Sequence, residues 1–177
     1  MAITKIQSES LNLADTYAFT GTVTGAATNT PAFEAYTTGL QSLTENTYVK
    51  LTMATEVYDT DNDYDNSTNY RFTPTSAGKY YVFAGLMANA NQVAQLKEVY
   101  IQLYKNGSGY AMLSEENLNN DYNEYKRTAV GSFIVDMNGT SDYLEIYTYI
   151  SNETGSPAYS GSGVKGTRFG AYKLIGA

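Results

Sequence analysis

The chain contains no cysteine and no histidine. Without cysteine it can form neither disulfides nor thiolate zinc sites. Without histidine it lacks the usual base of nucleophilic hydrolases and the commonest metal ligand. Acidic residues outnumber basic ones by 18 to 11, which leaves a net charge of −7 and argues against nucleic acid as a partner. These absences exclude most catalytic and nucleic-acid-binding classes.

Long hydrophobic runs are missing as well. No apolar stretch approaches the roughly 18 residues that span a bilayer. The first residues, 1–5, have no apolar segment of the kind that begins a secretion signal. We therefore expect a soluble chain, without a membrane span, that is made in a cytoplasm.

Carboxylates are the only catalytic candidates, and they lie in polar loops. Glu115 with Glu116, or the series 59–65, could be drawn as a glycosidase pair. Such a pair needs a separation of about 5 to 9.5 Å and one raised pKa. Neither set has the pattern of an apolar pocket around it, so we expect a protein that is not an enzyme.

Tyrosine is abundant, with 18 Tyr against 6 Phe and no Trp, and it suits half-exposed strand faces and wet interfaces. The segment 80–86 follows a turn and alternates as a strand. Its two faces carry Tyr80, Val82 and Ala84 on one side and Tyr81, Phe83 and Gly85 on the other. Because both faces are apolar, one should pack in the core and the other against a partner subunit.

Other segments also alternate, which predicts an all-β fold. Residues 99–105 end in Asn106-Gly107, a strong hairpin signal. A core face is expected where two later strands pair, formed by Phe133, Val135, Met137, Leu144, Ile146 and Ile150. Residues 88–97 read equally as a loop or as a helical turn.

Three motifs stand in a fixed order. The first, F-x-x-P-x-x-G-x-Y-x-F, is matched by Phe72, Pro74, Gly78, Tyr80 and Val82, with the Pro shifted by one position and Val in place of the second Phe. The second, V-x-L-x-K-N-G, is present as Ile101, Leu103, Lys105, Asn106 and Gly107. The third is the closing strand at 167–175. Together they resemble the C1q/TNF-like jelly-roll family over residues 31–175.

The resemblance implies a sandwich of about ten antiparallel strands assembled as a homotrimer. It implies a trimer interface formed by Phe33, Tyr81, Phe83 and Tyr172, with Tyr81 and Phe83 facing the threefold axis. We expect two parts in the chain, an extended N-terminal segment at 1–29 and the jelly-roll domain at 30–177.

The N-terminal segment includes Phe19-Thr20-Gly21-Thr22-Val23-Thr24-Gly25. This stretch resembles the junction before the C-terminal domain in tail-fibre-like proteins of phages, especially marine phages. The resemblance implies an attachment or trimerisation segment that contacts other virion proteins. The alternative is a frayed leader.

Two polar loops are candidate binding sites. In the first, Asp59, Asp61, Asp63 and Asp65 would line one side of an extended backbone and could bind Ca²⁺ through their oxygens. The alternative is a solvated surface loop. The second, within 115–126, offers Tyr122, Asn123 and Tyr125 as a receptor-binding surface, or it is a crossover loop of the jelly roll.

We therefore expect a non-enzymatic, trimeric structural protein of a bacteriophage, located in the virion after assembly in the host cytoplasm. The favoured role is a fibre or tip adhesin that binds a glycan or protein of the host surface. The alternative is a capsid or tail decoration protein that stabilises the particle. A secreted bacterial C1q-like lectin is disfavoured by the missing secretion signal. No cofactor is expected apart from the candidate Ca²⁺.

Overall fold

A computed structural model describes residues 28–90, 96–118, 124–153, 158–161 and 165–176. Within these ranges every regular element is a β-strand. No helix in the described residues is long and apolar enough to cross a membrane. The strands are β1 (Ala32–Tyr36), β2 (Gln41–Leu43), β3 (Val49–Lys50), β4 (Thr55–Asp59), β5 (Tyr64–Asp65), β6 (Arg71–Phe72), β7 (Gly78–Ala90), β8 (Leu96–Lys105), β9 (Ser108–Asn117), β10 (Lys126–Met137), β11 (Leu144–Asn152), β12 (Ala158–Ser160) and β13 (Arg168–Lys173).

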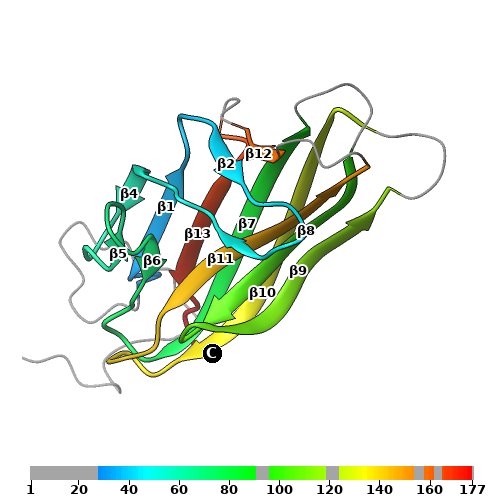
Figure 1. The fold of residues 1–177 in the computed structure, drawn as a ribbon. Helices are drawn as coiled ribbons and strands as arrows, with labels where there is room; N and C mark the ends of the chain where they lie inside the picture. Colours follow the sequence, from blue (N-terminus) through cyan, green and yellow to red (C-terminus); the bar gives the residue numbers. More distant parts are fainter. Residues whose placement is uncertain (1–27, 91–95, 119–123, 154–157, 162–164, 177) are drawn as a thin grey trace, which may run out of the picture.

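The strands form two antiparallel sheets, which lie face to face in Figure 1. The first sheet has the order β2-β12-β7-β13-β1-β4, and β10 pairs with the free side of β7. The second has the order β5-β6-β11-β8-β9, with β3 also paired to β11. The predicted all-β jelly-roll sandwich is confirmed.

Local signals placed several strands correctly. Asn106 and Gly107 have φ values of 54° and 77° and join β8 to β9 as a tight hairpin. Two consecutive positive φ values are what a two-residue hairpin turn requires. The undecided segment at 88–97 begins as the end of β7 and finishes as the start of β8, while residues 91–95 lie outside the described part.

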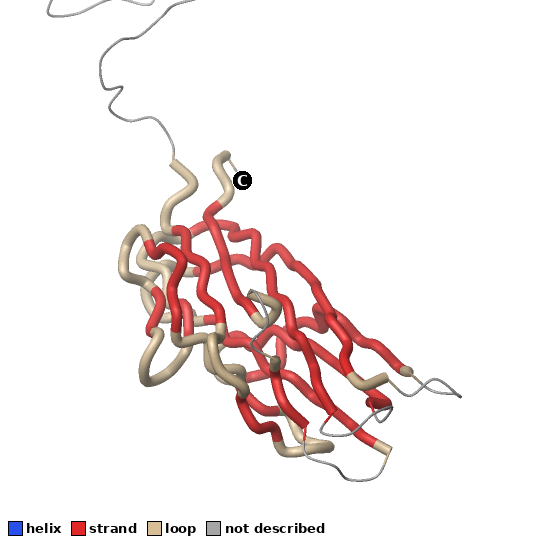
Figure 2. The backbone as a smooth tube through the Cα atoms, turned by 90° about the horizontal axis from the view of Figure 1, so that it is seen from above, coloured by secondary structure: helices blue, strands red, loops and turns tan. Residues whose placement is uncertain are grey.

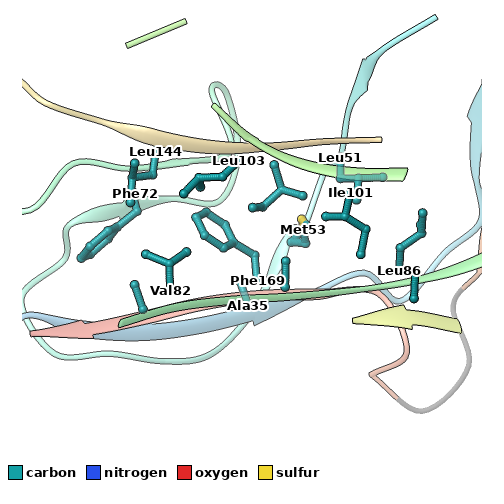
Figure 3. Close-up of a cluster of buried hydrophobic side chains, with 14 of the residues drawn as sticks. Ala35, Leu51, Met53, Phe72, Val82, Leu86, Ile101, Leu103, Leu144 and Phe169 are labelled. Carbon is teal, nitrogen blue, oxygen red and sulfur yellow. The ribbon is translucent and has the colours of Figure 1, made fainter. Parts of the chain in front are cut away.

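Alternating side chains of the two sheets meet between them and form one core (Figure 3). Tyr80, Val82 and Ala84 of β7 are at most 3% exposed, so the predicted core face of this strand is confirmed. Within this core, Phe33 stacks on Phe72 with ring centroids 4.5 Å apart. Such aromatic pairs add to the free energy gained from burying their area.

Phe33 is therefore a correction to the predicted trimer interface. Its side chain is 0% exposed and lies between the sheets, against Tyr64, Phe72 and Phe169. Residues 32, 34 and 36 are the positions of β1 that face outward, because side chains alternate along a strand.

Phe133 is a second correction. It lies opposite Val82 on the side of β10 that faces the core, yet it is 42% exposed. The reason is topological: β10 pairs only with β7, so it is the outermost strand of its sheet. The other five residues of that predicted core face, Val135, Met137, Leu144, Ile146 and Ile150, are buried as expected. The predicted pairing of their two strands is wrong, because β10 lies in the first sheet and β11 in the second, so the residues meet across the core.

The two sheets approach each other closely at this border. A Cβ on Gly131 of β10 would stand 2.1 Å from the carbonyl oxygen of Leu113 in β9. Only glycine allows the two backbones to pass at this distance. Gly131 thus allows β10 of the first sheet to pack directly against β9 of the second.

The two described ends of the chain lie together at one end of the sandwich (Figure 2). The amide of Lys173 donates to the carbonyl of Pro31 at 3.1 Å, which ties the last strand to the entry into β1. The last residue of β7 and the residue before β10 lie at the other end, where the amide of Ala90 donates to the carbonyl of Tyr125 at 3.0 Å. The domain therefore has a terminal end and a distal end.

Candidate functional site

The outer face of the first sheet carries the predicted interface side chains. Tyr81 of β7 pairs with Tyr172 of β13 on one side and with Ile134 of β10 on the other. Opposed residues in antiparallel strands share a face, so these three side chains form a row. The rings of Tyr81 and Tyr172 lie 5.4 Å apart, and the structure brings the two residues together as predicted.

A second row lies beside the first. Phe83 is half-buried, with its ring centroid 6.5 Å from that of Tyr81. Its partner across the strand pair is Gly170, where a Cβ would stand 2.3 Å from the Phe83 ring. Because Gly170 has no side chain, the ring of Phe83 packs over the backbone of β13 at this position.

The rows border an open hollow of about 340 Å³. Its lining includes Tyr81, Phe83, Val130 and Arg168. Val130 and Ile134 of β10 are 60% and 53% exposed, the values expected for a surface that lacks its cover. We call Tyr81, Phe83, Val130, Ile134 and Tyr172 the apolar face.

A different apolar surface follows the free border of the sandwich. Tyr110 and Met112 of β9 and Phe133 of β10 are 48%, 41% and 42% exposed. The rings of Tyr110 and Phe133 contact each other edge to face, with centroids 6.0 Å apart. We call these three residues the apolar edge.

The prediction from sequence missed the apolar edge as well as Val130 and Ile134. A signal was present, because residues 130–135 carry apolar side chains at both odd and even positions, as the segment 80–86 does. The pattern shows that both faces need cover. It does not show which strand lies at the border of a sheet.

The four aspartates of the first polar loop do not line one side of a strand, so that prediction is wrong. Asp59 ends β4, Asn62 turns the chain with φ 57°, and Asp65 lies in the next strand, β5. In the described residues no group of three or more acidic side chains is placed to hold a metal ion.

Protein donors occupy these carboxylates instead. Asp59 accepts the amide of Tyr64 at 2.9 Å, and Asp65 accepts the amides of Ser67 and Thr68 at 3.0 and 2.9 Å. Buried Asp63 accepts the amide of Thr75 at 2.9 Å. The aspartates thus fold the loop by capping its turns.

The environment shifts two of these carboxyls in opposite directions. The amide donors of Thr68 and Ser67 hold the pKa of Asp65 well below its ordinary value. Burial raises the pKa of Asp63, against the hydrogen bonds from Thr75 that lower it. The folded loop therefore favours the ionised form of Asp65.

Of the predicted receptor loop, Tyr122 and Asn123 lie outside the described residues, and Tyr125 is 44% exposed at the distal end. The ammonium of Lys126 lies 5.5 Å from the centroid of the Tyr125 ring, within range of a cation–π contact. Glu116, one of the carboxylates considered for catalysis, forms an ion pair with Arg127.

No protein-family model and no curated protein matches the chain by sequence. Solved structures do resemble it. The Eiger TNF of S. frugiperda matches with a TM-score of 0.53 and 12% identity, over 82% of this chain and 93% of that chain. Murine APRIL matches with a TM-score of 0.54 and 9% identity, over 81% and 98%. At such identities the likeness establishes the fold alone, and that fold is a C1q/TNF-like jelly roll.

Proposed function

We propose that the chain is a non-enzymatic subunit of a bacteriophage particle, that it works as a homotrimer, and that it is a fibre or tip adhesin for a host surface glycan or protein. The observation that carries the proposal is the apolar face, where tyrosine, phenylalanine, valine and isoleucine side chains lie on a sheet that no other described residues of the chain cover. A monomer that exposed this face would tend to aggregate.

The shape of the uncovered surface favours a closed ring. The apolar face and the apolar edge are different surfaces of one subunit, so a contact between them joins unlike patches. Contacts of this kind form rings when the rotation closes. The jelly-roll resemblance favours a ring of three subunits, and in such a ring Tyr81, Phe83 and Tyr172 would face the axis.

The two ends of the domain support a role in attachment. Pro31, the first residue of the domain to contact β13, lies at the terminal end, and the segment at 1–29 that precedes it contains the stretch that resembles the phage fibre junction. The receptor candidate Tyr125 lies at the distal end. A subunit held at its terminal end would direct the distal end toward a host cell. This function requires no cofactor.

Particles with and without the protein would test the role. Immunogold labelling of the complete phage should find the protein at a fibre tip, and particles without it should fail to adsorb while keeping their resistance to heat. If adsorption survives and the particles become fragile, the protein is a decoration protein. If the protein is absent from purified particles, both roles are wrong.

A further inference from the structure

The outer face of the second sheet, opposite the apolar face, carries five half-buried tyrosines. Tyr100 and Tyr104 come from β8, Tyr147 and Tyr149 from β11, and Tyr48 from the residue before β3. Their rings form two stacks. In one, Tyr100 lies against Tyr149 with centroids 5.3 Å apart, and Tyr48 lies beyond at 5.5 Å from Tyr149.

The other stack is much tighter. The ring centroids of Tyr104 and Tyr147 are 3.8 Å apart and the ring planes differ by 21°. Tyr147 pairs with Gln102, two residues before Tyr104, so the two tyrosines are diagonal neighbours on one face. The paired backbones of β8 and β11 therefore hold the two rings in contact.

Phenol rings in contact can be joined by oxidation. Each tyrosine gives one electron to an oxidant and one proton to solvent, which leaves a phenoxyl radical. Two radicals then form a carbon–carbon bond between ring carbons ortho to the oxygens. The hydrogen on each coupled carbon moves to the oxygen of its ring, and the net change is the loss of two hydrogen atoms.

The composition directs oxidation toward such a pair. The chain has no cysteine or tryptophan, so tyrosine and methionine are its readily oxidised side chains. Tyr81 with Tyr172, the tyrosine pair on the apolar face, has its ring centroids 5.4 Å apart. Among the described stacks, Tyr104 with Tyr147 has the shortest separation.

We propose that Tyr104 and Tyr147 form an oxidative crosslinking site, which one-electron oxidants convert to a dityrosine bond between β8 and β11. The bond would join neighbouring strands covalently in a chain that cannot make a disulfide. The site faces away from the apolar face, so the inference is independent of the trimer and of any role in a virion.

The test oxidises the full-length protein with photogenerated ruthenium(III) tris-bipyridine and persulfate, in a brief flash. We expect dityrosine fluorescence in a chain that still migrates as a monomer on a denaturing gel. Its intact mass should be lower by two hydrogens. Peptide mapping should find the residue 104 peptide joined to the residue 147 peptide.

Three variants make the test specific. Tyr104→Phe and Tyr147→Phe each keep a ring in the stack but remove the hydroxyl that forms the radical, so each should lose this product. Tyr100→Phe changes the looser stack by the same single atom and should retain it. Circular dichroism establishes that each variant is folded, and either stack variant suffices if the other does not fold.

Two results would overturn the proposal. One is a peptide map of the oxidised wild-type protein in which the joined 104 and 147 peptides are absent. The other is an equal yield of the intramolecular product in wild type and in a folded Tyr104→Phe or Tyr147→Phe variant.

Discussion

At the scale of single residues, Phe33 shows how one position can be given the wrong role. Its alternation with Ala32 and Glu34 assigns it to one face of a strand, but alternation does not say which face meets the other sheet. The structure puts Phe33 at 0% exposure among the rings of Tyr64, Phe72 and Phe169. Its loss would therefore act on folding rather than on assembly.

Phe33→Ala should lower the free energy of unfolding by about 3 to 5 kcal/mol, the usual cost of removing a buried phenylalanine. Denaturant unfolding at fixed protein concentration measures the change. Tyr58→Ala, at a position that is 42% exposed, is the control and should cost far less. A Phe33→Ala protein that unfolds like wild type but has a different oligomeric state would show that Phe33 acts in the subunit interface and not in folding.

Asp65 gives the folded state a dependence on pH. The amides of Thr68 and Ser67 hold its pKa below the value in the unfolded chain. The stabilisation is therefore complete above the ordinary carboxyl pKa of about 4 and is lost as the pH falls below it. Asp65→Asn should be less stable than wild type at pH 7, and the difference should shrink toward acid pH. A difference that is constant from pH 7 to pH 3 would contradict this assignment.

At the scale of elements, the sequence predicts the central strands but not which strands pair beside them. Alternation and the Asn106-Gly107 turn were enough to place β7, β8 and β11, because those signals are local. The border position of β10 depends on which strands pair across long sequence separations. For that reason the sequence did not separate exposed Phe133 from buried Val135.

The close approach of β10 to β9 can be tested at Gly131. Gly131→Ala should cost about 1 to 3 kcal/mol, since its methyl group would meet the backbone of Leu113 and overpack the border. Gly39→Ala is the matched control, because a Cβ there has nothing within 4 Å. Thermal or denaturant unfolding compares the two. Equal stabilities would show that the border can open without cost.

The aspartate loop also behaves as an element. The sequence showed the four acidic side chains but not the turn at Asn62 that separates them. Because protein amides already occupy Asp59, Asp63 and Asp65, a chelator should leave the melting temperature unchanged, and added Ca²⁺ should not raise it. A melting temperature that rises with Ca²⁺ concentration would show instead that the folded loop binds Ca²⁺.

At the scale of the whole molecule, one physical idea connects the sequence to the proposed function. Segment 80–86 is apolar on both sides, and the described residues bury one side fully but leave Tyr81 and Phe83 on the other side half-exposed. The sequence was sufficient to predict that Tyr81, Phe83 and Tyr172 lie on the same outer face. It was not sufficient to find the apolar edge, because that surface exists only where the borders of the two sheets meet.

The molar mass of the full-length protein in solution, measured by light scattering during size-exclusion chromatography, tests this idea most directly. The expected value is three times the chain mass of 19.4 kDa. Tyr81→Asp with Phe83→Asp should give a monomer or an insoluble chain. Tyr48→Asp with Tyr149→Asp, on the other sheet, should leave the mass unchanged. A wild-type mass of one chain, or a Tyr81→Asp, Phe83→Asp protein that remains a trimer, would contradict the account.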